Sequence, residues 1–172
     1  MLEKLEDLSK EELIKRVQLS AELSIAVDGI WFIAVEEEVG YDKALEMDID
    51  VWKRYVPVSI KRAKKYFDIA KSGLQGVKDM IRLDPLWLSI DLEFPEDTPE
   101  RLVFQVNRCP ALEAQERMGR EELTCEPVEV AYLTALAEAV DPKIKLTALK
   151  VPPRKSPDEI CCKWLFSFEG KK

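Results

Sequence analysis

The pattern of apolar residues changes its period at Asp84–Pro85, and this change limits the folds open to the chain. Before that point apolar residues recur every three or four positions, as in helices. After it, "LWLSIDLEF" (86–94) alternates apolar and polar residues, as in a half-buried strand. The sequence predicts a helical layer over residues 1–83 and a β-β-α-α-β-β half over residues 84–172, both in one compact domain. Helices packed on a four-stranded, mostly antiparallel sheet define an α+β fold.

Local signals place the individual elements. Ser9 and Glu12 form a capping box before a helix that we expect to run to Val39, with Gly40 as its C-terminal stop. Further helices are expected over 41–47, 51–71, 74–82, 110–119 and 127–140, and strands over 86–94, 102–106, 144–151 and 160–168. Asp50 is expected to cap the helix over 51–71, and Pro57 to kink or restart it, because proline cannot donate a hydrogen bond to the preceding turn.

Charge and composition exclude several classes of protein. A net charge of −7 and a pI near 4.9 argue against general binding to nucleic acid or to anionic membranes. The basic residues between positions 53 and 65 follow helical spacing, which is typical of a solvated helix face. The N-terminus has no apolar signal region, and no uninterrupted apolar run reaches the roughly 20 residues of a membrane span. We therefore expect a cytoplasmic protein without membrane or nucleic-acid partners. Few Asn and Gln residues beside many charged ones are a weak thermophile-like tendency.

The chain contains no histidine, which removes much of the usual catalytic chemistry. No Ser-His-Asp triad, Cys-His dyad or imidazole zinc ligand can form. Neither a G-x-G-x-x-G motif nor a P-loop is present, so we expect no nucleotide cofactor. Thiol, carboxylate, lysine, arginine and tyrosine chemistry remains.

The four cysteines are candidate nucleophiles or metal ligands. Cys109 and Cys125 each come just before a predicted helix, where the helix N-terminus lowers the pKa of a thiol and favours the thiolate. Cys162 is expected on the apolar face of the last strand, beside Trp164. The spacing contains no C-x-x-C pair, so on spacing alone a zinc site is a weak prediction. The alternative is that these cysteines are small buried hydrophobic residues.

A carboxylate and a glycine interrupt the most apolar stretch, "AVDGIWFIAV" (26–35). In a helix, Asp28 and Glu36 lie two turns apart and turn toward one side. A buried Asp28 must be paired, bind a metal or reach solvent, because an unpaired buried carboxylate costs several kcal/mol. Gly29 allows a ligand or another backbone to approach closely. The alternatives are that Asp28 faces solvent or pairs with an arginine such as Arg108.

The chain also carries a scattered set of residues that together resemble a family signature. They are Asp28–Phe32, Val35–Glu36 and Gly40 in the first half, and Arg108–Pro110, Ala114, Gly119, Cys125, Tyr132, Ala137, Val140–Lys145, Pro152–Pro153, Pro157, Cys162, Trp164 and Phe166 in the second. This set is similar to that of bacterial and archaeal proteins related to L-2-amino-thiazoline-4-carboxylic acid hydrolase. The second half also resembles, distantly and in layout, the 4-vinyl reductase ligand-binding domain, whose members bind small molecules or metals.

The resemblance implies hydrolysis of a C–N bond in a small sulfur-containing amino acid derivative. Cys109 would be the nucleophile or a metal ligand, Asp28 or Glu36 the base that activates a thiol or water, and Arg108 the group that holds the substrate carboxylate. Trp31 and Trp164 would contact the substrate.

Members of that family carry further cysteines before the Pro–Pro pair, where this chain has Ala148–Val151. A metal ion such as zinc would therefore have Cys109, Cys125 and Cys162 as ligands, with at most one carboxylate.

The sequence leaves three functions open. The first is a small-molecule hydrolase that uses thiol and carboxylate chemistry. The second is a non-catalytic domain, sensor-like, that binds a small ligand or a metal in the same pocket. The third is a helical interaction domain without a pocket. A helical layer of this kind can also form a homodimer, for which the sequence provides no measure.

Overall fold

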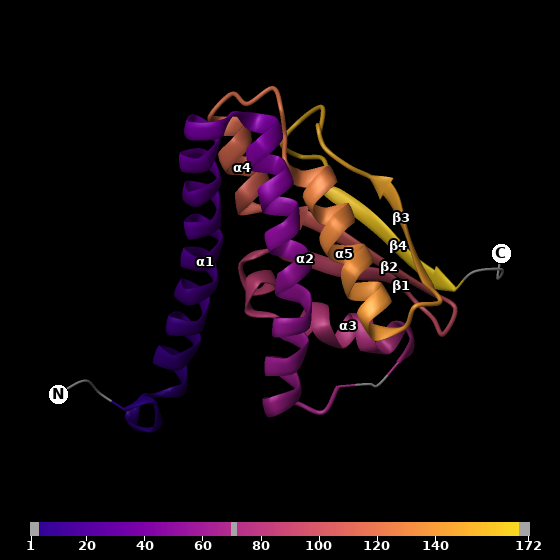
Figure 1. The fold of residues 1–172 in the computed structure, drawn as a ribbon. Coiled ribbons are helices and arrows are strands. Elements are labelled where there is room, and N and C mark those ends of the chain that lie inside the picture. Colours follow the sequence, from indigo (N-terminus) through magenta and orange to yellow (C-terminus); the bar gives the residue numbers. More distant parts are fainter. Residues whose placement is uncertain (1–3, 70–71, 169–172) are drawn as a thin grey trace.

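The computed structural model describes residues 4–69 and 72–168 and has the predicted α+β architecture (Figure 1). Its helices are α1 (Lys10–Val39), α2 (Tyr41–Tyr66), α3 (Gly73–Leu83), α4 (Pro110–Arg117) and α5 (Cys125–Val140). Two 3₁₀ helices, η1 (Leu5–Asp7) and η2 (Pro85–Ser89), precede α1 and the sheet. The strands are β1 (Asp91–Asp97), β2 (Arg101–Arg108), β3 (Ile144–Lys150) and β4 (Cys162–Phe168).

The four strands form one open antiparallel sheet in the order β1-β2-β4-β3. Helix α5 packs against β3 and against α2, so that α2 is separated from the sheet by α5 (Figure 1). Helix α1 lies outermost and contacts α2, η2 and α4. The molecule is therefore layered, with the sheet on one side and α1 on the other.

Both halves of the chain contribute to one hydrophobic core. Its largest fully buried side chains come from the sheet, where Phe104 on β2 lies opposite Trp164 on β4. Val56 from α2, Met80 from α3 and Leu133 from α5 bury their side chains against them. Burial of this apolar surface is the main force that holds the helices on the sheet.

Several sequence predictions are confirmed. The Ser9 hydroxyl accepts a hydrogen bond from the Glu12 N–H at 3.2 Å, as a capping serine should. Helix α1 ends at Val39, and Gly40 follows it with φ 83°, a left-handed value that glycine adopts without strain. The order of elements after α3 is β-β-α-α-β-β, as predicted.

Two local predictions are wrong. Residues 41–66 form one helix instead of separate helices over 41–47 and 51–71, and it does not restart at Pro57, because this proline is exposed and water can satisfy the carbonyl it leaves unpaired. Asp50 therefore lies inside α2 and pairs with Arg54 instead of capping a helix. Residues 85–89 form η2 instead of strand, because the Asp84 carboxylate accepts from the Leu86 N–H at 3.1 Å and Pro85 suits a first helical turn.

Much of the apolar surface of α1 faces solvent. Ile14, Val17, Leu23 and Val27 are all exposed. Among the described residues, α1 is the one helix long and apolar enough to cross a membrane, and only 11% of its most apolar window is buried. Length and composition alone do not separate such a span from a core helix or an N-terminal signal segment.

Candidate functional site

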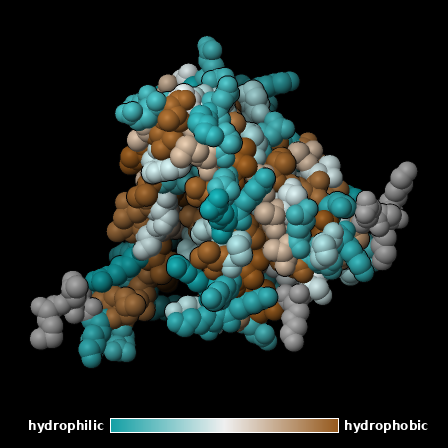
Figure 2. Space-filling model, in the orientation of Figure 1, coloured by the Kyte–Doolittle hydropathy of each residue, from teal (hydrophilic) through white to brown (hydrophobic). Residues whose placement is uncertain are grey.

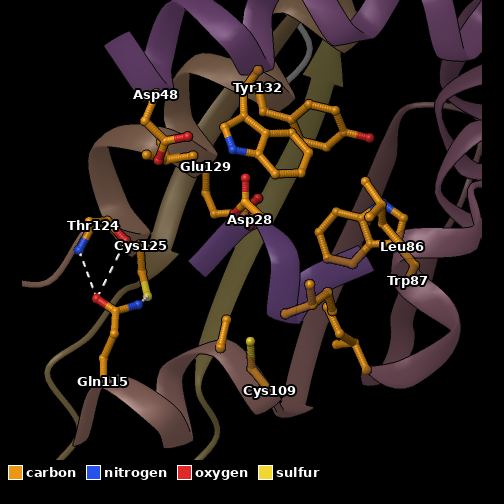
Figure 3. A pocket seen from close by; sticks show the side chains of 15 residues that line it. Asp28, Asp48, Leu86, Trp87, Cys109, Gln115, Thr124, Cys125, Glu129 and Tyr132 are labelled. Carbon is orange, nitrogen blue, oxygen red and sulfur yellow. Dashed lines mark hydrogen bonds between the residues drawn. The ribbon is translucent and has the colours of Figure 1, made fainter. Parts of the chain in front are cut away.

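A cavity of about 120 Å³ lies where α1, α2, η2, α4 and α5 meet. Three of its lining residues are acidic: Asp28 from α1, Asp48 from α2 and Glu129 from α5. Figure 3 shows their carboxylates turned toward the same space. No lysine or arginine of the described chain lines this inner cavity, so the three carboxylates have no cationic partner there.

Burial raises the pKa of all three acids. The pKa of Asp28 rises to about 6. The pKa of Asp48 rises to about 7, because burial and the nearby Asp28 charge both disfavour its ionised form, which Trp52 partly offsets. The pKa of Glu129 also rises to about 7, through burial and the charges of Asp28 and Asp48. Near neutral pH the cavity therefore holds a mixture of protonated and ionised carboxyl groups.

Aromatic rings form one wall of the cavity. Trp52 meets Tyr132 edge to face with ring centroids 5.6 Å apart, and Trp87 lies 6.1 Å from the same tyrosine ring. Five buried polar atoms of the lining form no hydrogen bond of normal geometry within the described part of the chain, although Trp52 is close enough to Asp48, and Trp87 to Tyr132, to lower their pKa values. These atoms are Asp48 Oδ1, Glu129 Oε2, Trp52 Nε1, Trp87 Nε1 and the Tyr132 hydroxyl. Unpaired polar atoms are costly when buried, so this cluster is suited to a polar ligand or to water.

The thiols of Cys109 and Cys125 line the same cavity, at the starts of α4 and α5. Both cysteines lie at helix N-termini, as predicted, but neither thiol has the lowered pKa that the sequence led us to expect. The backbone N–H groups of α4 lower the pKa of Cys109 only in part, and burial raises it to about 11. Burial raises the pKa of Cys125 to about 12. Both groups are therefore neutral thiols at pH 7, because the loss of solvation outweighs the helix terminus.

Gln115 on α4 holds the loop that precedes α5. Its side-chain oxygen accepts from the Thr124 N–H at 3.1 Å, and its Nε2 lies 3.5 Å from the sulfur of Cys125 (Figure 3). This amide fixes the Cys125 side chain beside the acids.

Cys162 on β4 is half-buried and does not line the cavity, although its sulfur is close enough for Glu129 to raise its pKa. Within residues 4–69 and 72–168, no group of three Cys, Asp or Glu side chains is arranged to hold a metal ion. The zinc site implied by the resemblance stays a prediction without geometric support.

A second, wider hollow of about 480 Å³, called the vestibule below, lies between α1 and α4. Asp28, Asp48 and Gln115 line both spaces, so the two are adjacent. Two arginines, Arg117 and Arg120, line the vestibule. The vestibule therefore carries both signs of charge, because Glu22 lines it as well and Arg120 is paired with Glu36.

Other residues predicted for the site lie elsewhere. Glu36 accepts two hydrogen bonds from the Arg120 guanidinium, at 2.6 and 2.7 Å, and this pairing lowers its pKa. Arg108 is exposed on β2 and pairs with Glu113, so it does not reach the cavity. Trp31 is 39% exposed on α1 and Trp164 is fully buried in the core, and neither lines the cavity.

Sequence reasoning missed Asp48, Glu129 and Tyr132. A signal for the two acids does exist. Glu129 precedes the buried Tyr132 and Leu133 by three and four positions, which puts it on the buried face of α5. Asp48 lies four positions after the buried Ala44 and four before Trp52. In both helices, an acidic residue at a position that helical spacing assigns to the buried face is the sequence signal for this cavity.

The fold and the cavity define an α+β protein with an acidic, aromatic-walled cavity among its helices. The chain belongs to a family of unknown function, DUF6125, which matches residues 6–168. No curated protein matches the chain, and no solved structure matches it.

Proposed function

We propose that this protein binds a small zwitterionic amine or amidine in the inner cavity and hydrolyses one of its C–N bonds. The observation that carries the proposal is the meeting of Asp28, Asp48 and Glu129 in one cavity without a lysine or arginine among its described lining residues. A cationic ligand would relieve the repulsion among these carboxylates. The indole rings of Trp52 and Trp87 would add cation–π attraction.

The vestibule supplies the complementary half of the ligand site. Arg117 and Arg120 line it, and Arg117 has no ion pair in the described chain. A carboxylate on the ligand would lie toward these guanidinium groups while the cationic end enters the acidic cavity. Small sulfur-containing amino acid derivatives, such as a 2-amino-thiazoline-4-carboxylate, have this distribution of charge.

Acid–base catalysis by the carboxyl groups accounts for the chemistry better than a thiolate does. With pKa values of about 6 and 7, Asp28 and Glu129 can share one proton near neutral pH. The ionised carboxylate would take a proton from water as its oxygen bonds to the amidinium carbon. The protonated carboxyl would then give its proton to the departing nitrogen as the C–N bond breaks. The carboxylate left by that transfer would take the remaining proton of the added hydroxyl as the carbonyl forms, so that one water is consumed.

In this proposal Cys109 is not the nucleophile that the resemblance implies but a neutral thiol that contacts the ligand. A thiol with a pKa of about 11 is almost entirely protonated at neutral pH. Cys109 and Cys125 would contact the sulfur-bearing side of the ligand as polarizable neutral groups.

The test is calorimetric titration with 2-amino-thiazoline-4-carboxylate and with its isosteric analogue that lacks the ring-borne amino group, followed by an assay for ring opening. We expect the amino compound to bind and the analogue to bind at least about tenfold more weakly, since a charge-assisted contact contributes about 1.5–3 kcal/mol. Asp28→Asn and Glu129→Gln should abolish ring opening, whereas Cys109→Ala should retain it. The exposed Asp50→Asn is the matched control.

Other outcomes separate the alternatives. Binding without turnover would support the non-catalytic ligand-binding domain that the sequence also left open. Loss of turnover in Cys109→Ala with Asp28→Asn active would restore the thiol mechanism. Equal binding of both compounds would contradict the proposal that the acids recognise a cation.

A further inference from the structure

Helix α1 carries a second apolar face that nothing in the described chain covers. Its inner face buries Ala21 and Phe32 against the body of the protein. Its outer face exposes Leu19, Leu23, Val27 and Ile30, whose side chains are 53–68% accessible. Figure 2 shows these hydrophobic residues gathered along the α1 edge of the molecule. A helix that is apolar on both faces requires a second packing partner.

The spacing on this outer face is that of a helix–helix seam. Leu19, Leu23, Ala26 and Ile30 follow one another at intervals of four, three and four residues. This alternation is the heptad repeat of apolar positions that pack as knobs into the holes of another helix. Ala26 in the middle of the seam allows two helices to approach closely.

We propose that the chain forms an antiparallel homodimer through the outer face of α1. Pairing two copies about a two-fold axis between Ala26 and Val27 puts Leu23 opposite Ile30 of the second copy. The same pairing puts Leu19 opposite Ala34. Every contact then occurs twice, as an isologous interface requires.

The charges at the two ends of the face agree with this register. Pairing about the same axis puts Arg16 opposite Glu37 and Lys15 opposite Glu38 of the second copy. All four side chains are exposed, and the acidic run follows the apolar face just as the basic residues precede it. Lys15 and Arg16 also pair with Glu11 and Glu12 of their own helix, so the N-terminal end is mixed in charge. A parallel pair would instead place Glu37 and Glu38 of the two copies together.

The face is large for a monomer. With Trp31 at its flank, the outer face exposes on the order of 500 Å² of apolar surface, above the few hundred Å² usual for a monomer and more than half of the roughly 800 Å² per partner of a standard interface. A membrane is the less suitable partner. The face ends in Glu37 and Glu38, the chain is acidic, and insertion of α1 would break the Glu36–Arg120 pair.

The dimer would also change the surroundings of the vestibule. Ala26 and Ile30 belong to the outer face and line the vestibule as well. The second copy would therefore cover the vestibule beside Ala26 and Ile30 and contribute side chains to its lining.

The test is the mass of the full chain by sedimentation equilibrium at micromolar concentration. We expect twice the 19.8 kDa of one chain. Leu23→Glu with Ile30→Glu should weaken association at least about a hundredfold, because the pairing would bury four carboxylates in the seam. Val58→Glu on α2, a position that is 44% exposed, is the matched control and should leave the mass unchanged. Circular dichroism checks that each variant is folded.

A charge exchange distinguishes this dimer from others. Arg16→Glu and Glu37→Arg should each weaken association, and the double variant should restore it. A monomeric chain, or a dimer indifferent to the Leu23 and Ile30 substitutions, would overturn the proposal. So would a monomer that floats with phosphatidylcholine–phosphatidylglycerol vesicles, since that would assign the face to a membrane.

Discussion

The carboxylate of Asp28 on α1 raises the pKa of Glu129 on α5 across the cavity that both residues line. The two acids are a hundred positions apart in the sequence, and each sits among apolar neighbours on its own helix. The packing of the surrounding core places the two carboxylates together and offsets the free energy of their repulsion. Groups that destabilise a fold and share a cavity are often kept for binding or catalysis.

The cavity acids should make the protein more stable at pH 5 than at pH 8. Asp28, Asp48 and Glu129 have folded-state pKa values of about 6, 7 and 7, above their unfolded values near 4. The folded state therefore holds more protons between pH 4 and 7, and the free energy of unfolding falls as pH rises through that window. Thermal melts across pH 5–8 measure the effect.

Asp48→Asn should make the melting temperature less dependent on pH between pH 5 and 8, whereas Asp50→Asn, at an exposed position, should leave that pH dependence unchanged. Below about pH 4.5 the trend should reverse, because ion pairing lowers the pKa of Glu36 and Glu116 and protonation removes those pairs. A melting temperature that rises steadily from pH 5 to pH 8 would contradict the burial of the three acids.

The cavity thiols should react slowly. With pKa values of about 11 and 12, Cys109 and Cys125 hold at most about one thiolate in ten thousand at pH 7, against a few per cent for an ordinary cysteine. Alkylation by iodoacetamide in the native protein should therefore be at least about a hundredfold slower than in the urea-unfolded chain. Mass spectrometry of the peptides identifies each site. Fast labelling of Cys109 would instead indicate an activated nucleophile.

The Glu36–Arg120 pair should anchor the end of α1. Both side chains are largely buried, with 21% and 16% exposed, and the guanidinium lies 5.6 Å from the centre of the Phe32 ring. Arg120→Ala should lower the free energy of unfolding by about 2 kcal/mol, because it leaves a half-buried carboxylate without its partner. Urea denaturation measures this. Arg54→Ala, which breaks an exposed pair, should cost less than about 0.5 kcal/mol, and equal losses would contradict the anchoring role.

Tyr55 should hold the aromatic wall of the cavity through Asp84. The Tyr55 hydroxyl lies 2.9 Å from both carboxylate oxygens of Asp84, which is 2% exposed and caps η2 at Leu86. Tyr55→Phe should cost about 1–2 kcal/mol, since the buried carboxylate loses a donor. It should also shift the fluorescence of Trp87, which follows in η2. Tyr66→Phe, at a 70% exposed position, is the control, and identical behaviour of the two variants would refute the link.

The predictable part of the fold rests on local signals. Ser9, Gly40 and the change of period at Asp84–Pro85 identify the start of α1, its end and the passage from helices to sheet. The restart expected at Pro57 does not occur, because a helix can continue through an exposed proline whose unpaired carbonyl partner is reached by water. The start of the first strand was predicted too early as well. The alternation of apolar residues from Leu86 onward also runs through the short 3₁₀ helix η2, which Asp84 caps.

The sequence by itself determined the class of fold, the order of its elements and the exclusion of histidine chemistry, because these follow from residue type and spacing along the chain. It also singled out Asp28, Cys109 and Cys125, which interrupt apolar runs or precede helices. Only the tertiary structure decided that Asp48 and Glu129 join them and that Arg108 and Glu36 do not. The physical reason is that burial, and with it the pKa of a side chain, depends on which helix faces meet, and helical spacing leaves that choice to the packing of distant elements.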